Sequence, residues 1–267
     1  MNGIKYQNQK LVEGLDFLWL EITPSCNLHC KHCYTQSSPF LNDPKIVDWQ
    51  KVLVDAYKLG CKQVQFIGGE PTYQSKLLDY VRTAHNLGYR FIEVYTNLTL
   101  LTDNFADEFS RFGVNVATSF YSCHEEIHDG ITGVKGSFKK TVAGIRKILN
   151  KKIPLRIGIV TLDINKHEVN DVQRFLIRLG VDKNCIRTDH TRPVGRGLNL
   201  TTYENLEGSL CGRCWRGKLT ISWDGNCYPC VFARIVNVGN VLTKNLSEIV
   251  SSEELKKFRI SIYNYKR

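Results

Sequence analysis

Short apolar runs alternate along most of the chain with segments whose apolar residues recur every three to four positions. The runs predict buried strands, and the segments between them predict amphipathic helices. We expect strands over residues 16–23, 63–67, 90–97, 114–120, 155–160 and 185–188. We expect helices over residues 45–59, 74–87, 103–112, 137–149 and 166–179. Strict alternation of strand and helix is typical of parallel strands joined by crossover helices, so the chain has an α/β pattern.

Two architectures fit this alternation: a doubly wound sheet and a partial (β/α)6 barrel. Both collect functional residues at the carboxyl ends of their strands. Between the fourth strand and the next helix we expect a loop through His128–Gly130, with Ser137 as the N-cap of the helix that follows.

The pattern changes after residue 190, where a turn-rich stretch over 191–210 has no periodicity. We therefore predict two domains, residues 1–192 and 193–267. In the second, Asp224-Gly225 separates two strand-like runs, which is a strong hairpin signal. A last helix is expected over residues 246–257, so this part is a small extension of a β-hairpin and a helix.

Composition narrows the class of protein. Apolar residues make up 42% of the chain, but no stretch approaches the roughly 18 apolar residues of a membrane span. Residues 1–7 lack the apolar core of a signal peptide, so we expect a cytoplasmic protein without membrane contact. Ten cysteines in a cytoplasmic chain indicate metal binding or redox chemistry rather than disulfides.

The formal net charge of +10 favours an anionic partner such as an acidic peptide, a phosphorylated metabolite or nucleic acid. The basic residues are scattered, with modest concentrations only over 146–156 and 256–267. A solvated surface explains most of them, which argues against nucleic acid.

Three cysteines, Cys26, Cys30 and Cys33, have the spacing C-x3-C-x2-C directly after the first predicted strand. A loop this short can direct three thiolates into one small volume. Three thiolates on a four-iron cluster leave one iron without a protein ligand, and that iron is open to a substrate or cosubstrate. A zinc knuckle that lacks one ligand, or three reduced structural thiols, are the simpler alternatives.

Polar residues follow several of the later strands. Gly68-Gly69-Glu70-Pro71 follows the second, Thr96-Asn97 ends the third, and Ser119 lies at the end of the fourth. Two glycines allow the backbone to approach a ligand closely, and Glu70 with nearby carbonyls could accept from an ammonium group. Each of these stretches is also compatible with an ordinary turn.

A second cysteine group has the spacing C-x2-C-x12-C-x2-C, and its second pair lies beside the predicted hairpin. From spacing alone, a zinc ribbon is the default interpretation. The group consists of Cys211, Cys214, Cys227 and Cys230.

The first cysteine loop resembles the signature of the radical S-adenosylmethionine (SAM) superfamily. The resemblance implies a partial (β/α)6 barrel in which Cys26, Cys30 and Cys33 hold a [4Fe-4S] cluster that chelates SAM. It also implies that Gly68, Gly69 and Glu70 bind the SAM amino group. Further implied contacts are Thr96-Asn97 near the ribose, Ser119 at the carboxylate and Tyr34 near the adenine, although Tyr34 also fits a packed core tyrosine.

The stretch 223–230 resembles the hairpin of SPASM and Twitch extensions, which bind auxiliary [4Fe-4S] clusters. Residues 129–138 and 192–197 also resemble SPASM-bearing maturases. No cysteine follows Cys230, so we expect one auxiliary cluster, with all four cysteines of the second group as its ligands.

Three cysteines lie outside both groups. We expect Cys61 and Cys185 to be buried small apolar residues. Cys123 follows the fourth strand and is either a loop thiol or, as in epimerases of this superfamily, a hydrogen donor to a substrate radical.

The resemblance implies that a 5′-deoxyadenosyl radical removes hydrogen from a substrate C–H bond, with flavodoxin or ferredoxin as the reducing partner. We expect a maturase that crosslinks or otherwise oxidises a ribosomally made peptide. The alternative is a dehydrogenase or epimerase of a small sugar-like metabolite or of a peptide residue. A zinc-stapled nucleic-acid-binding protein is the non-enzymatic alternative, and it leaves the cysteine loop and the Gly68-Gly69-Glu70 turn unexplained.

Overall fold

The computed structural model describes residues 13–201 and 206–265. Its centre is one sheet with the strand order β6-β5-β4-β3-β2-β1-β7-β8-β9. The first six strands are all parallel, and each pairs with the next one along the chain. Their bounds are β1 Phe17–Glu21, β2 Gln63–Ile67, β3 Phe91–Tyr95, β4 Asn115–Phe120, β5 Leu155–Thr161 and β6 Ile186–His190.

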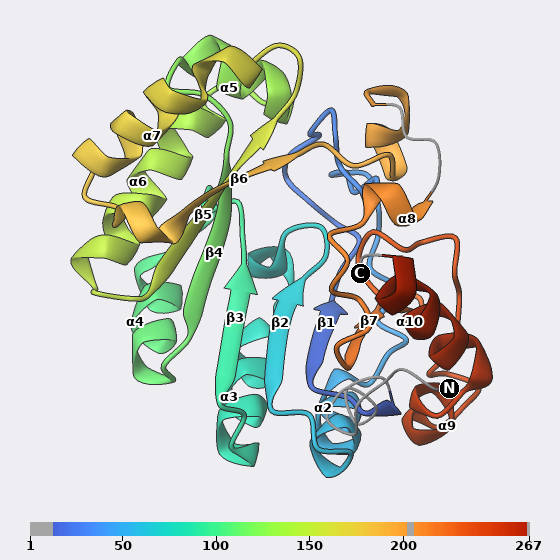
Figure 1. Ribbon diagram of the computed structural model, residues 1–267. Helices are drawn as coiled ribbons and strands as arrows, with labels where there is room; N and C mark the ends of the chain where they lie inside the picture. The colour runs from blue at the N-terminus through green and yellow to red at the C-terminus, as the bar shows by residue number, and fades with distance from the viewer. Residues whose placement is uncertain (1–12, 202–205, 266–267) are drawn as a thin grey trace.

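The strand order decides between the two architectures that fit the sequence pattern. A doubly wound sheet contains a point where the strand order reverses. The order from β1 to β6 has no reversal, and β6 pairs with β5 alone among the described strands. The sheet is therefore an unclosed partial barrel, as the resemblance implied (Figure 1).

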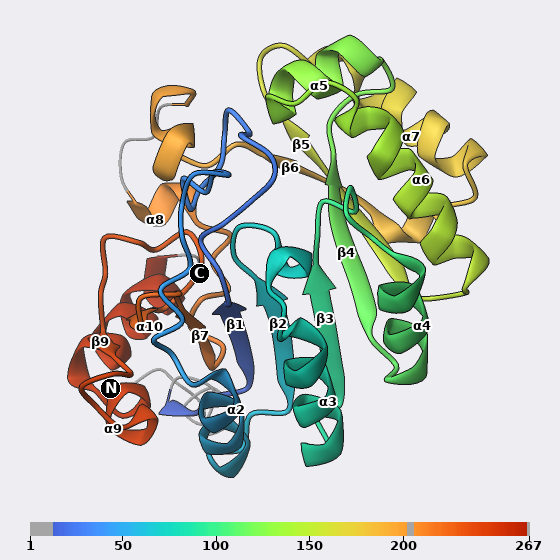
Figure 2. The same ribbon diagram turned by 180° about the vertical axis from the view of Figure 1, so that it is seen from behind.

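Helices cover one face of this sheet, and the main core lies between the two layers. Figure 2 shows α2 and α3 in front of β2 and β3. Alternate strand residues such as Leu18, Val64, Phe66 and Val94 point into this core and are fully buried. The helices of this layer are α2 Trp49–Lys58, α3 Leu77–Leu87, α4 Asp103–Arg111, α5 Glu125–Thr132, α6 Ser137–Asn150 and α7 Val169–Arg178, with short 3-10 turns η1 Pro71–Tyr73, η2 Lys166–Glu168 and η3 Lys183–Cys185.

All six predicted strands are confirmed, and the predicted helices differ mainly at their ends. Helix α2 begins at Trp49 rather than near residue 45, because the Asp48 side chain accepts from the Lys51 N–H and caps the helix there. Helix α3 begins at Leu77 because the separate turn η1 precedes it, and it ends as predicted at Gly88, which has a left-handed φ of 86°.

The loop predicted through His128–Gly130 is wrong, since these residues lie in α5. The predicted N-cap Ser137 is also wrong, because Gly136 occupies that position with a φ of 83°. The Asp129 carboxylate takes over the capping role: it accepts from the backbone N–H of Phe138 at 2.8 Å and from that of Gly136. One side chain thus ties α5 to the start of α6.

The C-terminal part extends the same sheet. Strand β7 (Lys218–Ile221) pairs in parallel with β1, and the antiparallel strands β8 (Asn226–Tyr228) and β9 (Gly239–Asn240) follow. The predicted hairpin is confirmed, with Gly225 at a φ of 83° in its turn. Because the sheet is continuous from β1 to β7, the domain boundary between residues 192 and 193 stays a prediction.

The predicted last helix is two helices, α9 Leu246–Val250 and α10 Glu253–Tyr265, because the chain turns at Ser251-Ser252. The connecting stretch contains η4 Gly195–Asn199 and α8 Leu206–Ser209. None of the helices in the described part of the chain is long and apolar enough to cross a membrane.

Candidate active site

The first cysteine loop leaves β1 at its carboxyl end, and it begins with Cys26, Cys30 and Cys33. All three thiols are free. The Cys26 Sγ accepts from the backbone N–H of Leu28 at 3.4 Å, and the Cys26 N–H donates to the Ser38 carbonyl at 3.2 Å, which closes the loop. Burial raises the pKa of the Cys26 thiol, and it raises that of Cys30 to about 12. Without a positive partner, these sulfurs stay protonated at neutral pH.

Helix α5 supports the first cysteine loop through backbone hydrogen bonds. The backbone N–H groups of His29 and Lys31 donate to the carbonyls of Thr132 and Ile131, each at 2.9 Å. Carbonyls in the last turn of a helix have no partner within the helix, so the loop satisfies two of them. Gly133 follows with a φ of 73°, and a Cβ there would lie 2.8 Å from the His29 carbonyl oxygen. The helix that the sequence pattern missed is therefore a support of the cysteine loop.

The turn after β2 packs against the start of the same loop. The backbone N–H groups of Gly69 and Glu70 donate to the carbonyls of Thr23 and Ser25 at 2.7 and 2.8 Å. A Cβ on Gly69 would lie 2.0 Å from the Ser25 carbonyl oxygen, and one on Gly68 would lie 2.5 Å from that of Thr23. The two glycines thus allow a close approach to the chain itself, whereas the sequence suggested a close approach to a ligand.

Glu70 joins the ends of β2 and β3. Its buried carboxylate accepts from the backbone and hydroxyl of Thr72, from the Thr96 hydroxyl, and from the Asn97 N–H at 2.7 Å. Burial raises the pKa of this carboxyl, and the four donors act against that effect. Oε1 takes three of the donors and Oε2 only one, so Oε2 can accept one further donor, such as an ammonium group.

Asn97 connects β3 to the first cysteine loop. Its Nδ2 donates to the Asn27 Oδ1 at 2.9 Å and lies 3.9 Å from the Cys26 Sγ. Asn27 in turn donates to the Thr99 hydroxyl at 2.7 Å. The predicted residues Thr96 and Asn97 therefore lie beside the cysteines, together with Asn27 and Thr99, which sequence reasoning missed. Spacing gives no signal for such a pair, whose members are 72 residues apart.

Ser119, at the end of β4, hydrogen-bonds to the Tyr95 hydroxyl at 2.9 Å. Tyr121 follows on the same side, forms a side-chain hydrogen bond with Cys30, and packs against the His32 ring at 5.1 Å. His32, between the second and third cysteines, was also missed. Burial and the nearby Arg196 lower its pKa to about 4, and its Nδ1 is buried without a hydrogen-bond partner among the described residues. A neutral imidazole edge next to the cysteines is therefore left for a ligand.

The segment 195–197 contacts the first cysteine loop through hydrogen bonds from Arg196. The Arg196 side chain donates to the carbonyls of Cys30 at 2.8 Å and Ser37 at 2.9 Å, and its backbone N–H donates to the Cys33 carbonyl at 2.9 Å. Its guanidinium lowers the pKa of the Cys30 thiol, against the effect of burial. The signal for this contact was the turn-rich stretch that contains it, although the stretch did not reveal the partner.

Tyr34 packs against the C-terminal part of the chain. Its ring lies 5.5 Å from that of Phe232 and 5.3 Å from the Arg234 guanidinium. Glu21, at the end of β1, is fully buried, pairs with Arg234, and hydrogen-bonds to Tyr34. Burial raises the pKa of Glu21, while Arg234 acts in the opposite direction. This ion pair joins the first cysteine loop to the segment after Cys230, and the adenine contact of Tyr34 stays a prediction.

In the second cysteine group, hydrogen bonds link the thiols of Cys211, Cys214 and Cys230, whereas the thiol of Cys227 lies apart. The buried Cys214 thiol hydrogen-bonds to Cys211 and to Cys230, which lowers the pKa of Cys211 to about 5 and also lowers that of Cys230. Cys227 has no such contact: its Sγ lies 3.6 Å from the Gly225 carbonyl oxygen, and it packs in the main core. The four thiols therefore do not converge as a tetrahedral zinc ion requires.

No hydrogen bond in the described part of the chain joins Cys123 to either cysteine group. Cys123 is half-buried in the loop between β4 and α5, and the charged groups that act on it are Glu168, Asp171 and Arg178, near the start and end of α7. Its predicted role as a hydrogen donor finds no contact in support among the described residues. Cys61 is fully buried in the core and Cys185 is half-buried, which agrees with their predicted packing roles.

The inner face of the sheet, opposite the helices, carries polar groups. Glu93 is buried and accepts two hydrogen bonds of 2.7 Å from Arg156, and Gln65 donates to the same carboxylate. Tyr95 lies two residues after Glu93 in β3, and Ser119 lies in the neighbouring strand β4. These contacts form a network of polar side chains on the inner face of the sheet.

The donor sets fit iron–sulfur clusters. The first loop offers three free thiols with N–H donors and one guanidinium nearby, and such hydrogen bonds tune a cluster. The second group offers three thiols, in which Cys214 hydrogen-bonds to both Cys211 and Cys230.

Sequence comparisons agree with this geometry. The sequence model of the Radical SAM superfamily matches residues 20–176, and that of SPASM, an iron-sulfur cluster-binding domain, matches residues 211–267. The radical SAM domain binds a [4Fe-4S] cluster and SAM, and the SPASM domain binds auxiliary iron–sulfur clusters.

Three relatives illustrate the range of similar proteins. The tungsten-containing aldehyde ferredoxin oxidoreductase cofactor-modifying protein of Pyrococcus furiosus is 27% identical over 94% of this chain and 85% of its own length. The subtilosin biosynthesis protein AlbA of Bacillus subtilis is 24% identical over 87% of this chain, which spans 58% of AlbA. The structure of Streptococcus suis SuiB bound to the precursor peptide SuiA superposes with a TM-score of 0.76 at 15% identity, over 94% of this chain and 68% of SuiB.

Proposed function

The chain belongs to the radical SAM superfamily, and on this premise we propose that it modifies a ribosomally made peptide by an oxidative reaction such as a crosslink. The observation that carries the proposal is the first cysteine loop. Its three thiols lie at the carboxyl edge of β1, joined by hydrogen bonds to the ends of β2 and β3. When bound, the reduced cluster and SAM supply a 5′-deoxyadenosyl radical that removes a hydrogen atom from a substrate C–H bond.

The residues of this chain position the reactants and keep water away. Cys26, Cys30 and Cys33 hold the cluster, and Glu70 with the turn at Gly68-Gly69 receives the SAM amino group. Asn97 is placed for the ribose. We assign Ser119, which hydrogen-bonds to Tyr95, to the carboxylate, and Tyr34 to the adenine.

A peptide substrate is supported by the relatives and by the open sheet. AlbA acts in bacteriocin biosynthesis, another relative is a PqqA peptide cyclase, and SuiB binds a precursor peptide. The sheet is unclosed beyond β6, and the net charge of +10 favours an acidic peptide. A flavodoxin or ferredoxin in the cytoplasm would supply the electron.

The auxiliary cluster, in the domain over residues 193–267, would take up the electron that the substrate radical loses. We assign its thiolates to Cys211, Cys214 and Cys230, because these three are in contact. Cys227 was expected to join them, and we leave it out because its thiol faces the core.

The test uses anaerobically reconstituted enzyme, reductant, SAM and short peptides encoded beside the gene. We expect 5′-deoxyadenosine to form and one peptide to lose two hydrogen atoms, with deuterium from the modified position appearing in 5′-deoxyadenosine. SAM cleavage that transfers deuterium from no peptide would contradict the peptide proposal. Bound zinc without any SAM cleavage would contradict the whole assignment.

A dehydrogenase of a small sugar-like metabolite is the second candidate. It is favoured by the second cysteine group, whose three linked thiols provide ligands for a single auxiliary cluster. The same assay separates the two, since only metabolite oxidation would move deuterium from a labelled sugar alcohol. Incorporation of solvent deuterium into a peptide at otherwise constant mass would indicate epimerisation.

A further inference from the structure

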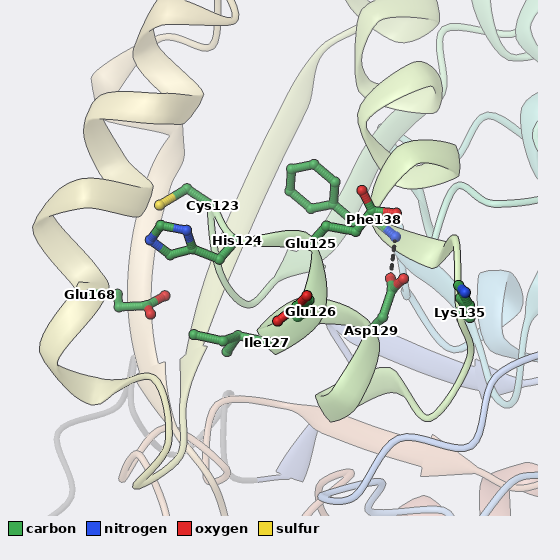
Figure 3. Close-up of a pocket in the computed structure, with 9 residues that line it drawn as sticks. All are labelled: Cys123, His124, Glu125, Glu126, Ile127, Asp129, Lys135, Phe138 and Glu168. Carbon is green, nitrogen blue, oxygen red and sulfur yellow. Dashed lines mark hydrogen bonds between the residues drawn. The ribbon is translucent and has the colours of Figure 1, made fainter.

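A pocket of about 990 Å³ lies outside both cysteine groups, between α5 and the first turns of α6 and α7. Its charged lining is mainly acidic, because four carboxylates face a single lysine, Lys135. Figure 3 shows Cys123, His124 and Glu168 together at one end of this pocket, with Asp129 and Lys135 at the other. The lining residues are Cys123, His124, Glu125, Glu126, Ile127, Asp129, Lys135, Phe138 and Glu168. The excess of carboxylates makes the pocket attractive to cations.

Cys123, His124 and Glu168 bring a sulfur, a nitrogen and an oxygen donor to one point. Their ligand atoms all lie within 4.8 Å of one another, and no other group of three such residues does so in the described parts of the chain. A zinc ion with ligand distances of about 2.0 to 2.3 Å would fit among atoms at this separation. The geometry therefore suits one ion rather than an iron–sulfur cluster.

The fold explains why the three donors meet. Cys123 and His124 follow β4, whereas Glu168 follows β5 and ends η2. These strands are parallel neighbours, so their carboxyl ends lie at the same edge of the sheet. Ser122 fixes the arrangement, because its hydroxyl donates to the Glu168 carboxylate and accepts from the His124 N–H at 2.9 Å. Such a partner behind a ligand orients it for a metal.

The Glu168 carboxylate gives the strongest argument for a bound cation, because it is buried. The Glu168 side chain is only 7% exposed, and its partners among the described residues are the Ser122 hydroxyl and the exposed His167 ring, which lies 3.7 Å from Oε1. A buried carboxylate is costly unless a cation or several donors compensate its charge. The half-buried thiol and the exposed imidazole beside it supply further metal ligands rather than a compensating cation.

We propose that Cys123, His124 and Glu168 bind one divalent transition-metal ion of the zinc class, with a fourth position open to the pocket. Sulfur and imidazole donors select against Mg²⁺ and Ca²⁺, which take oxygen ligands. Three protein ligands with one open position is the arrangement of zinc sites that accept a water or a ligand group. This site is separate from the proposed peptide reaction.

The test measures zinc binding to cluster-loaded enzyme, in which the cluster cysteines are already occupied. Equilibrium dialysis against Zn²⁺ under anaerobic conditions should load one zinc per chain, and X-ray absorption at the zinc edge should show a single sulfur at about 2.3 Å with nitrogen and oxygen ligands. Cys123→Ser and His124→Ala should each weaken binding more than tenfold, and Ser122→Ala about tenfold. The controls Cys185→Ser and His85→Ala remove a thiol and an exposed imidazole elsewhere, and they should bind zinc as wild type does.

Three results would overturn the site. One is no zinc bound above the level of the Cys123→Ser/His124→Ala double variant. The second is zinc surrounded by three or more sulfurs, which places it at displaced cluster cysteines. The third is equal binding by wild type and both single variants. Circular dichroism of each variant shows whether it has folded, and the Ser122→Ala variant keeps all three ligands if the others fail to fold.

Discussion

The two cysteine groups differ in what holds them. The first loop is fixed by backbone hydrogen bonds with α5 and with the turn after β2, and by backbone and side-chain hydrogen bonds from Arg196. The second lies on the β7–β8 hairpin and is otherwise fixed by side chains, namely a small apolar cluster around Cys214 and Cys230 and the pair of Glu21 and Arg234. The first site is therefore determined by the barrel itself, whereas the second depends on packing between the extension and β1.

This difference separates the proposed roles. A rigid loop at the strand edge suits the cleavage of SAM, which needs fixed geometry. The second cysteine group is connected to the first loop through the Glu21–Arg234 pair and Tyr34. It suits a later electron transfer, because an electron can move between groups that are not in direct contact.

Removal of the first set of thiols should abolish SAM cleavage, whereas removal of the second set should not. The variant Cys26→Ala/Cys30→Ala/Cys33→Ala should lose about four iron atoms per chain and all formation of 5′-deoxyadenosine. The variant with alanine at 211, 214 and 230 should lose about as much iron and all modified product, yet still cleave SAM. Liquid chromatography of the nucleoside and iron analysis provide the measurement. Complete loss of SAM cleavage in a folded second variant would refute the division of roles.

Arg234→Gln should destabilise the protein by about 3 kcal/mol, because it leaves the Glu21 carboxylate buried and unpaired. The pKa of Glu21 is already raised by burial, and loss of Arg234 raises it further. A carboxyl with a raised folded-state pKa stabilises the fold when protonated, so the variant should regain stability as the pH falls. Denaturant unfolding of the holoenzyme at pH 6 and pH 8 measures this.

The double variant Glu21→Gln/Arg234→Gln is the matched control, since it removes both charges. Its stability should exceed that of Arg234→Gln at pH 8 and should depend less on pH. An equal loss in both variants would show that packing of Arg234 on Tyr34 and Tyr228 matters more than the charge.

Cys227→Ser and Cys230→Ser should differ, although the two residues form one C-x2-C pair. We expect Cys227→Ser to keep its iron and to lose about 1–3 kcal/mol of stability, because a hydroxyl replaces a thiol in the apolar core. Cys230→Ser should lose auxiliary iron. Iron analysis with a thermal scan distinguishes them, and equal iron loss would return Cys227 to the ligand set.

Arg196→Gln should lower the reduction potential of the SAM-binding cluster by some tens of millivolts, since it removes the cation nearest to Cys30. An EPR-monitored redox titration measures the shift, and the exposed Arg90→Gln is the control. A shift of the same size in both variants would mean that net charge, rather than the contact with the loop, sets the potential.

The sequence was sufficient for the strands, the helical layer and the residues that meet at the strand ends. Each of these depends on local periodicity or on short spacing. Helix α5 escaped prediction because only His128, Ile131 and Thr132 are buried along it, and Gly130 interrupts the pattern. The capping of the start of α6 by Asp129 of α5 is a contact that periodicity does not show.

Spacing predicts Cys227 as a cluster ligand, whereas the structure places its thiol in the main core. In β8 the register pairs Cys227 with Ile221, on the side that faces the core, whereas Cys230 lies beyond the strand and faces the smaller cluster. Strand alternation, rather than the C-x2-C spacing, decides which thiol can reach its neighbours. Arg196 was out of reach for another reason, because it contacts Cys30 across 166 residues of sequence.

The most direct test of the two-site account is EPR spectroscopy of the reduced enzyme with and without SAM. We predict two iron–sulfur signals, of which one changes when SAM is added. That signal should be absent from the Cys26→Ala/Cys30→Ala/Cys33→Ala variant, whose remaining signal should not respond to SAM. A remaining signal that responds to SAM, or a wild-type spectrum in which both signals shift equally, would contradict the account.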